Sequence, residues 1–246
     1  NMGFKYDLNK SIMSVESHYR AIKINKQFKL VAGLDRNKSV IKLFKKKTNI
    51  PGYLNIKDLK KKIKHIDLFI ISTNHESHLS CIKDIVKFFK PKLILCEKPL
   101  SSSYEDAKKI CYICKKNNIP LKVNYTRRID RTISQIRNRI KDKKNYAFVN
   151  YSKNVLTNAS HFINLFQMIF GKFIKIKSKN KFNFDIDFKN ASANFRKVSS
   201  SSPLSNTFKI LNNNFKIERE STKLKITNLK NNEKKNYMIS KKLILF

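Results

Sequence analysis

Short apolar runs alternate with amphipathic, lysine-rich segments between Phe28 and Tyr125. Short apolar runs are typical of strands buried in a parallel sheet, and segments of ~10 to 15 residues with helical periodicity are typical of the crossover helices between them. The expected strands are 30–34, 52–54, 67–72, 92–96 and 121–124, and the expected helices are 39–47, 57–63, 77–89 and 104–116. This order predicts an α/β domain with a doubly wound, Rossmann-like parallel sheet.

The pattern changes after Tyr125. A basic helix over 129–140, a strand over 146–151 and an apolar helix over 160–170, closed by Gly171, come first. Alternating apolar and polar positions then dominate, as in 182–188 and 208–217, with polar turns at 199–202 and 212–214. We therefore expect an α+β domain with a largely antiparallel sheet and a few helices on one side. The predicted domains are 1–124 and 125–246.

The formal net charge of +37 raises the question of nucleic-acid binding. The lysines are spread through nearly every segment, without a basic tail or a basic stripe interleaved with aromatics. We interpret the charge as a solvated basic surface, so a nucleic-acid partner is not expected. No apolar stretch approaches the ~20 residues that span a bilayer, and the start lacks the apolar core of a signal peptide. We expect a cytoplasmic protein with no membrane association.

Four cysteines do not form the framework of a secreted disulfide protein in a chain of this length. Cys111 and Cys114 make a C-x-x-C pair, which is compatible with redox chemistry or half a zinc site. The pair lies inside the helix expected over 104–116, and no second pair with metal-ligand spacing accompanies it. We interpret both as helix cysteines that face the core, and we expect no metal site.

The apolar run 93–96 stops abruptly at Glu97, Lys98 and Pro99. Pro99 ends the strand, because proline cannot donate to a ladder and restricts the residue before it. Lys98 therefore lies at the carboxyl end of a buried strand, where open α/β sheets bind their ligands. By position alone, Lys98 is either a ligand-binding residue or a solvated lysine at a strand end.

Asp35 ends the first visible strand, at the position from which a doubly wound fold binds the adenosine ribose. A carboxylate there repels a 2′-phosphate, which favours NAD, while neighbouring Arg36 leaves NADP open. Gly3 is either a terminal glycine or the last glycine of a phosphate-binding loop. In the second case a first strand and two glycines precede residue 1, and without that strand the sheet has a central gap.

These elements together resemble the glucose-fructose oxidoreductase and inositol dehydrogenase family (Gfo/Idh/MocA). The resemblance covers residues 1 to about 171. Beyond them it rests only on the alternating pattern of apolar and polar positions. The matching motifs, in order, are Val31-Ala32-Gly33-Leu34-Asp35, Tyr53 before Asp58-Leu59, the strand 67–72 with Thr73-Asn74 and His78, Glu97-Lys98-Pro99-Leu100, Val123-Asn124-Tyr125 with Arg127-Arg128, and Leu156 to Gly171 around His161. It implies an NAD(P)-dependent oxidoreductase that acts on a hydroxyl or keto group of a sugar, cyclitol or nucleotide-linked sugar.

The resemblance also implies roles for single residues. Lys98 would contact both cofactor and substrate, and His161 would be the acid/base for the hydroxyl proton, unless it is only a satisfied histidine at a helix start. The implied cofactor residues are Gly3, Asp35, Arg36, Thr73, Asn74, His78, Glu97 and Lys98. The implied substrate residues are Lys98, Arg128, Thr157, Asn158 and His161. His78 has an alternative interpretation as a histidine on a helix surface.

The sequence departs from the family at two positions near His161. The family often has an acid four residues before this histidine and another three after it, where this chain has Thr157 and Asn164. These departures leave open a rival function, an inactive cofactor-fold protein used for binding or assembly. A basic nucleic-acid-binding protein is the second, less favoured rival, and it rests on the net charge of +37. By analogy with the family, an open sheet in the second domain would pack against a partner, so we expect a homo-oligomer.

Overall fold

The computed structural model describes residues 3–4, 15–129, 132–140, 144–178, 180–220 and 223–238. The described chain divides between Asn124 and Tyr125 into two compact units. Each unit has a hydrophobic core of its own. None of the helices in the described part of the chain is long and apolar enough to cross a membrane.

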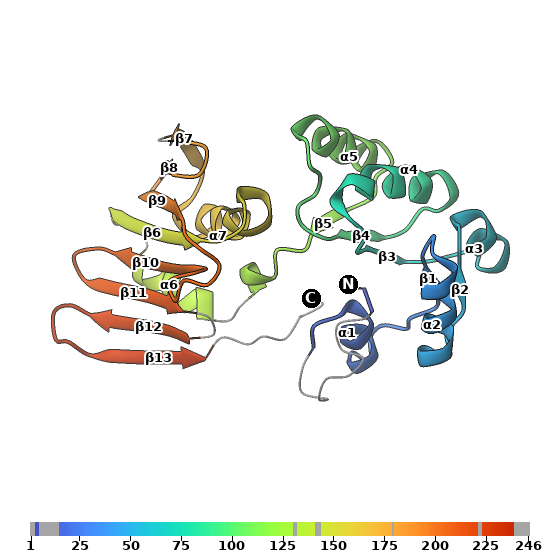
Figure 1. The fold of residues 1–246 in the computed structure, drawn as a ribbon, viewed down its shortest axis with the longest axis horizontal. Coiled ribbons are helices and arrows are strands. Elements are labelled where there is room, and N and C mark those ends of the chain that lie inside the picture. The colour runs from blue at the N-terminus through green and yellow to red at the C-terminus, as the bar shows by residue number, and fades with distance from the viewer. Residues whose placement is uncertain are drawn as a thin grey trace. The chain divides into compact units, whose positions relative to one another are not determined.

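The strands of the first unit are parallel, as the alternating pattern predicts, and they form two separate sheets (Figure 1). One sheet pairs β1 (Gly33–Leu34) with β2 (Gly52–Tyr53). The other has the order β3-β4-β5, formed by Leu68–Ile71, Leu93–Cys96 and Leu121–Val123. The strand predicted over 30–34 is too long, because only its last two residues, Gly33 and Leu34, pair with a neighbouring strand.

The helices of the first unit begin at polar caps. They are α1 (His18–Ile24), α2 (Lys38–Thr48), α3 (Ile56–Lys62), α4 (His78–Phe88) and α5 (Tyr104–Lys116). The side chains of Asn37 and Ser103 accept hydrogen bonds from the first turns of α2 and α5. Helix α1 begins after Ser17, which is extended and whose hydroxyl caps the backbone N–H of Arg20.

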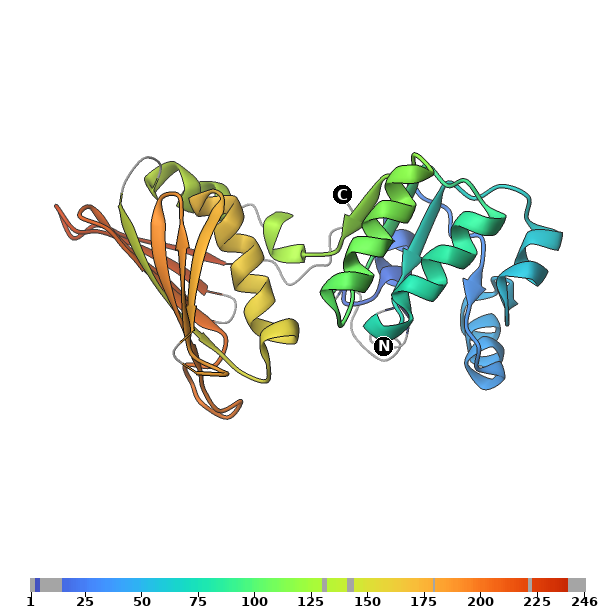
Figure 2. The same ribbon diagram turned by 90° about the horizontal axis from the view of Figure 1, so that it is seen from above.

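Strand β4 is buried on both faces. Ile94 and Cys96 pack into the core beneath α4 and α5, which cover the same face of this sheet (Figure 2). Leu95 points to the opposite face and packs with Ala21 and Ile22 of α1. Side chains alternate across a strand, so a continuous apolar run is what two covered faces require. The carboxyl end of β4 therefore emerges from a fully packed layer.

The second unit is an eight-stranded sheet covered on one face by α6 (Thr132–Ile140) and α7 (Ser160–Phe170) (Figure 2). Its strand order is β13-β12-β11-β10-β6-β9-β8-β7, and only β6 and β9 pair in parallel. In chain order the strands are β6 (Asn145–Tyr151), β7 (Phe173–Ser178), β8 (Phe184–Phe188), β9 (Ala191–Lys197), β10 (Thr207–Leu211), β11 (Phe215–Glu220), β12 (Lys223–Asn228) and β13 (Lys234–Met238). The predicted α+β class is confirmed. A short 3₁₀ segment η3 (Thr126–Ile129) and a π-helical turn η4 (Val155–Ala159) precede the two helices.

Aromatic side chains fill the core between α7 and the sheet. Phe166 is fully buried, and its ring lies within 6.4 Å of the ring centroids of four other phenylalanines: Phe170, Phe188, Phe195 and Phe208. Gly171 ends α7 with a φ of 89°, a conformation that favours glycine, so the predicted helix end is confirmed. The apolar face of α7 is thus the main packing surface of the second unit.

The interpretation of the C-x-x-C pair is half wrong. Cys114 is buried in the core beneath α5, but Cys111 is exposed, and both thiols are free. Residues three apart on a helix point in directions that differ by about 60° around the helix axis. Cys114 therefore faces the core, while Cys111 lies at the edge of the apolar face and is exposed.

Replacing Phe166 by alanine will destabilise the second unit by about 3–5 kcal/mol, because it leaves a cavity among four rings. Urea unfolding followed by circular dichroism measures this loss. Phe173→Ala is the matched control, since Phe173 is 47% exposed on β7, and it will change the free energy of unfolding by no more than ~0.5 kcal/mol. Equal losses for the two variants would contradict this description of the core.

Candidate active site

Polar side chains gather where the three parallel strands β3, β4 and β5 end. Ile71 of β3 and Cys96 of β4 are paired in register, and Cys96 is paired with Val123 of β5. The residues that follow these strands are Thr73 and Asn74 after β3, Glu97 and Lys98 after β4, and Asn124 after β5. Backbone hydrogen bonds from Glu97 N to Ile71 O (2.9 Å) and from Asn124 N to Cys96 O (2.8 Å) continue the ladder beyond the strands. The structure thus brings these predicted residues to one edge of the sheet.

The Glu97 carboxylate is the buried centre of this edge. Its Oε1 lies 2.7 Å from Nε2 of His18 and accepts a hydrogen bond of 2.7 Å from Nδ2 of Asn124. Burial by itself raises the pKa of Glu97, but the hydrogen bonds from His18 and Asn124, with the charge of His18, outweigh it and hold the pKa below its usual value. One carboxylate therefore ties α1, the end of β4 and the end of β5 together.

Sequence reasoning missed His18 as part of this site. Its ring is 3% exposed on the first turn of α1, 79 residues away from Glu97 in sequence. A histidine early in an amphipathic helix gives no local sign of a distant carboxylate partner. Asn124 was visible only as part of the Val-Asn-Tyr motif, and its contact with Glu97 became evident from the pairing of β4 with β5.

Lys98 follows the anchored carboxylate and is half-buried. Its peptide bond to Pro99 is cis. The backbone N–H of Lys98 also contributes to lowering the pKa of Glu97, so the fixed carboxylate holds the start of the loop that carries the lysine. The structure therefore places Lys98 at the strand end that the sequence predicts.

His78 is fully buried, which excludes the alternative of a histidine on a helix surface. Its Nδ1 lies 3.1 Å from Leu100 O and 3.2 Å from Cys96 Sγ, and its Nε2 lies 3.2 Å from Thr73 O. Burial is the main cause that raises the pKa of the Cys96 thiol to about 12, so this thiol stays protonated. The imidazole ties together the loops that follow β3 and β4, and a direct contact with a cofactor stays a prediction.

Asp35 lies at the carboxyl end of β1, half-buried, next to the exposed Arg36. Its Oδ1 accepts a hydrogen bond of 2.9 Å from the backbone N–H of Asn37, which forms the turn into α2. Gly3 lies beside the first turn of α1, where its carbonyl accepts a hydrogen bond of 3.0 Å from Tyr19 N. Both positions are compatible with the predicted cofactor contacts, which remain predictions.

The predicted substrate residues other than Lys98 belong to the second unit. His161 lies on the first turn of α7, where the ring of Tyr125 meets it edge-on at a centroid distance of 5.8 Å. Thr157 Oγ1 donates to Asn154 Oδ1 at 2.9 Å, and Asn158 Nδ2 donates to Asn206 Oδ1 at 2.7 Å. These two side chains therefore hold the π-helical turn η4 in place ahead of His161, while Arg128 is exposed.

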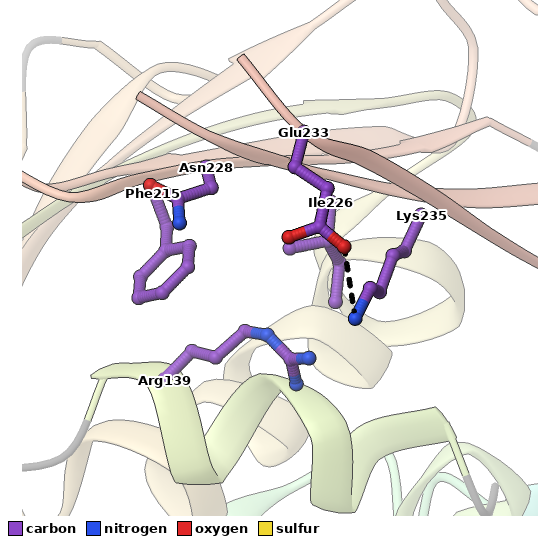
Figure 3. A pocket seen from close by; sticks show the side chains of 6 residues that line it. All are labelled: Arg139, Phe215, Ile226, Asn228, Glu233 and Lys235. Carbon is purple, nitrogen blue, oxygen red and sulfur yellow. Dashed lines mark ion pairs between the residues drawn. The ribbon is translucent and has the colours of Figure 1, made fainter. Parts of the chain in front are cut away.

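A separate pocket lies between α6 and the sheet of the second unit (Figure 3). It is lined by Arg139, Phe215, Ile226, Asn228, Glu233 and Lys235. Arg139 Nη1 already donates to the backbone and side-chain oxygens of Gln135, and Glu233 pairs with Lys235 at 3.1 Å. None of the residues predicted for the site lines this pocket. Among the described residues, no group of three or more His, Cys, Asp or Glu side chains is arranged to hold a metal ion.

Comparison with known proteins supports the assignment of the first unit. Residues 12–125 match the Gfo/Idh/MocA family model, which is described as an oxidoreductase family with an NAD-binding Rossmann fold. The predicted resemblance and the predicted class of cofactor agree with this match. No sequence among the curated proteins matches the chain.

Solved structures with the same two-part fold include three dehydrogenases. The dehydrogenase MviM from Clostridium difficile has a TM-score of 0.73 at 16% identity, covering 91% of this chain and 78% of the other. The inositol dehydrogenase homolog from Azotobacter vinelandii, complexed with NADH and myo-inositol, has a TM-score of 0.71 at 16% identity, covering 89% and 71%. The WlbA dehydrogenase from Bordetella pertussis, in complex with NADH and UDP-GlcNAcA, has a TM-score of 0.66 at 14% identity, covering 78% and 71%. At these identities the likeness shows the fold.

Replacing Glu97 by glutamine will lower the free energy of unfolding at pH 7 by roughly 2–3 kcal/mol, because it removes a buried charge that is hydrogen-bonded to His18 and Asn124. The pKa of Glu97 is lowered by folding. The stabilisation is therefore fully present above the ordinary glutamate pKa of ~4.3 and is lost as the pH falls through the lower pKa of the folded state.

Urea unfolding at pH 7 and at pH 3.5 measures this dependence. The difference in the free energy of unfolding between the wild type and Glu97→Gln will be smaller at pH 3.5 than at pH 7. Glu105→Gln, on the exposed first turn of α5, is the matched control and will cost less than ~1 kcal/mol at either pH. A Glu97→Gln deficit that does not change between the two pH values would contradict an ionised, anchored carboxylate.

Proposed function

From the membership of residues 12–125 in the Gfo/Idh/MocA family of oxidoreductases with an NAD-binding Rossmann fold, we propose that this chain is an NAD(P)-dependent oxidoreductase. It transfers a hydride between nicotinamide and a hydroxyl or keto group of a sugar, a cyclitol or a nucleotide-linked sugar. The observation that carries the proposal is the Glu97-Lys98-Pro99 loop, held at the carboxyl end of a buried strand by the hydrogen-bonded Glu97 carboxylate.

The residues at the strand ends fit the ribose and nicotinamide parts of the cofactor. Asp35 ends β1, where a carboxylate accepts hydrogen bonds from a ribose. Thr73, Asn74 and Lys98 follow β3 and β4, at the edge where open α/β sheets bind ligands. The sequence contains no Gly-x-Gly, so the fit rests on these side chains rather than on a phosphate-binding loop. When bound, the nicotinamide supplies the acceptor or donor of the hydride.

Lys98 and His161 are the proposed catalytic residues. Oxidation of a carbinol needs a base for the hydroxyl proton, and an imidazole with an ordinary pKa near ~6.5 suits that task near neutral pH. His161, with Tyr125 packed edge-on against its ring, takes this proton. The Lys98 ammonium steadies the charge that develops on the substrate oxygen. In the reduction His161 gives the proton back to the substrate oxygen, and Lys98 stabilises the charge on that oxygen as it does in the oxidation.

The similar structures support the proposed substrate class without fixing it. One of them is complexed with NADH and myo-inositol, and another with NADH and UDP-GlcNAcA. The exposed side chains of Tyr146 and Phe148 on β6 are consistent with the expectation of a homo-oligomer, which stays a prediction. A cofactor-fold protein without catalysis is the rival function, because Thr157 and Asn164 stand where the family often has acids.

We expect NADH to bind with saturable enhancement of its fluorescence. Asp35→Ala will weaken NADH binding roughly tenfold and reduce the preference for NADH over NADPH, since the carboxylate contacts the ribose and repels a 2′-phosphate. Asp84→Ala, at an exposed position on α4, is the control and will leave both affinities unchanged. Absence of saturable NADH binding by the intact protein would refute the oxidoreductase proposal.

His161→Asn will lower kcat at least ~100-fold on a sugar that the protein reduces or oxidises, because it removes the general acid/base. It will leave the Kd for NADH unchanged, since the assigned role concerns the substrate proton. Steady-state kinetics and NADH titration measure the two quantities on the same preparation. An unchanged kcat would assign the proton transfer to another group. NADH binding without turnover of any sugar or cyclitol by the wild type would support the non-catalytic rival.

A further inference from the structure

Two arginines lie close together in the second unit, beside the start of α7. The guanidinium of Arg127, from η3, lies 4.2 Å from the ring centroid of Phe162. Its Nη1 is buried and has no hydrogen-bond partner in the described structure. Buried donors are nearly always paired in folded proteins, and a guanidinium that lies over a ring can still donate to an acceptor in the plane of the guanidinium.

Arg219 brings a second positive charge to the same place. It lies on β11, is 7% exposed, and is paired in register with Phe208, whose ring contacts Phe162. Burial, and then the charge of Arg219, lowers the pKa of Arg127 to about 9. Arg219 therefore adds positive potential beside the unpartnered Nη1 of Arg127, and this potential favours an anionic acceptor for that donor.

The arginine pair adjoins the predicted acid/base. Tyr125 contacts His161, and two residues later Arg127 contacts Phe162, the next residue of α7. The segment 125–129 thus runs alongside the first turn of α7. Its Tyr125 contacts His161, and its Arg127 contacts Phe162. Arg127 is therefore a candidate to contact another substituent of the molecule whose hydroxyl meets His161.

We propose that Arg127 and Arg219 form a subsite for an anionic substituent of the substrate, a carboxylate or a phosphate, so that the substrate is an acidic sugar or cyclitol derivative. This inference rests on the proposed function and narrows its substrate class. Arginine forks match the planar geometry of a carboxylate and the oxygens of a phosphate. A neutral analogue binds more weakly at such a site, because it pairs the buried donor of Arg127 without the charge-assisted hydrogen bond that an anion provides.

The pocket of Figure 3 is the alternative place for an anion in this unit. Its arginine, Arg139, uses Nη1 for two hydrogen bonds to Gln135, and its lysine is paired with Glu233. The lysine of this pocket is thus ion-paired and Nη1 of its arginine is hydrogen-bonded, whereas Nη1 of Arg127 is buried without a hydrogen-bond partner. This difference favours the pair at the start of α7 and defines a matched control.

Ligand-observed NMR with D-glucuronate, D-glucose 6-phosphate and D-glucose tests the subsite on the intact protein, with and without NADH. At least one of the two acidic sugars will bind roughly tenfold or more tightly than glucose. The comparison between glucuronate and glucose 6-phosphate separates a carboxylate from a phosphate. Arg127→Gln will abolish the preference for the acidic sugar, and Arg127→Lys, which keeps the charge but not the fork, will reduce it.

Controls separate binding from folding. Arg139→Gln, in the pocket of Figure 3, and Arg196→Gln, at an exposed position on β9, will leave the preference unchanged. The thermal midpoint of each variant is measured without ligand, and only variants that unfold cooperatively are compared. Equal binding of acidic and neutral sugars by the wild type, or loss of the preference in Arg139→Gln alone, would overturn the subsite.

The outcomes also distinguish this inference from the proposed function. Binding of the acidic sugars through Arg127 in a protein that does not bind NADH would refute the oxidoreductase proposal and leave the anion subsite in place. Turnover of glucose and glucuronate with equal kcat/KM would support the oxidoreductase and refute the subsite.

Discussion

The site in the first unit depends on one buried carboxylate. Glu97 follows a strand that is packed on both faces, and its side chain is held by His18 and Asn124. Taking a carboxylate out of water is costly unless hydrogen bonds compensate it, and here His18 and Asn124 provide them. Because its partners come from α1 and from the end of β5, the packing of three elements fixes the start of the loop that presents Lys98.

A second set of contacts keeps the neighbouring loop in place. The buried imidazole of His78 lies within hydrogen-bonding distance of carbonyl oxygens in the segments after β3 and β4. Glu97 and His78 thus lie at the same edge of the sheet. Glu97 fixes the loop that carries Lys98, and His78 joins that loop to Thr73. Catalytic sites require such preorganised supports, since a small displacement of a reacting group costs much of the rate. This is the structural basis for proposing chemistry at the strand ends.

Much of the fold followed from the hydrophobic pattern, because helices with caps and strands covered on both faces leave clear periodic signals. The bounds of α5 and α7 agree with the predicted 104–116 and 160–170. The strand over 30–34 was predicted too long, because pairing depends on a neighbouring strand and not on local apolarity. The contact of His18 with Glu97 and that of Arg127 with Phe162 were missed for a related reason: the partners are 79 and 35 residues apart in sequence. Contacts over such distances become visible only in the folded chain.

We propose that Lys98 at the end of β4 and His161 at the start of α7 serve hydride transfer to or from a carbon of a sugar-like substrate. The most direct test incubates the protein with NADH that carries deuterium at both positions of nicotinamide C4 and with a panel of neutral and acidic keto sugars, followed by mass spectrometry of the sugars. Hydride transfer predicts one deuterium bound to carbon in a reduced sugar. Tight binding of the labelled NADH, with all of the label remaining on the nicotinamide across the panel, would contradict it.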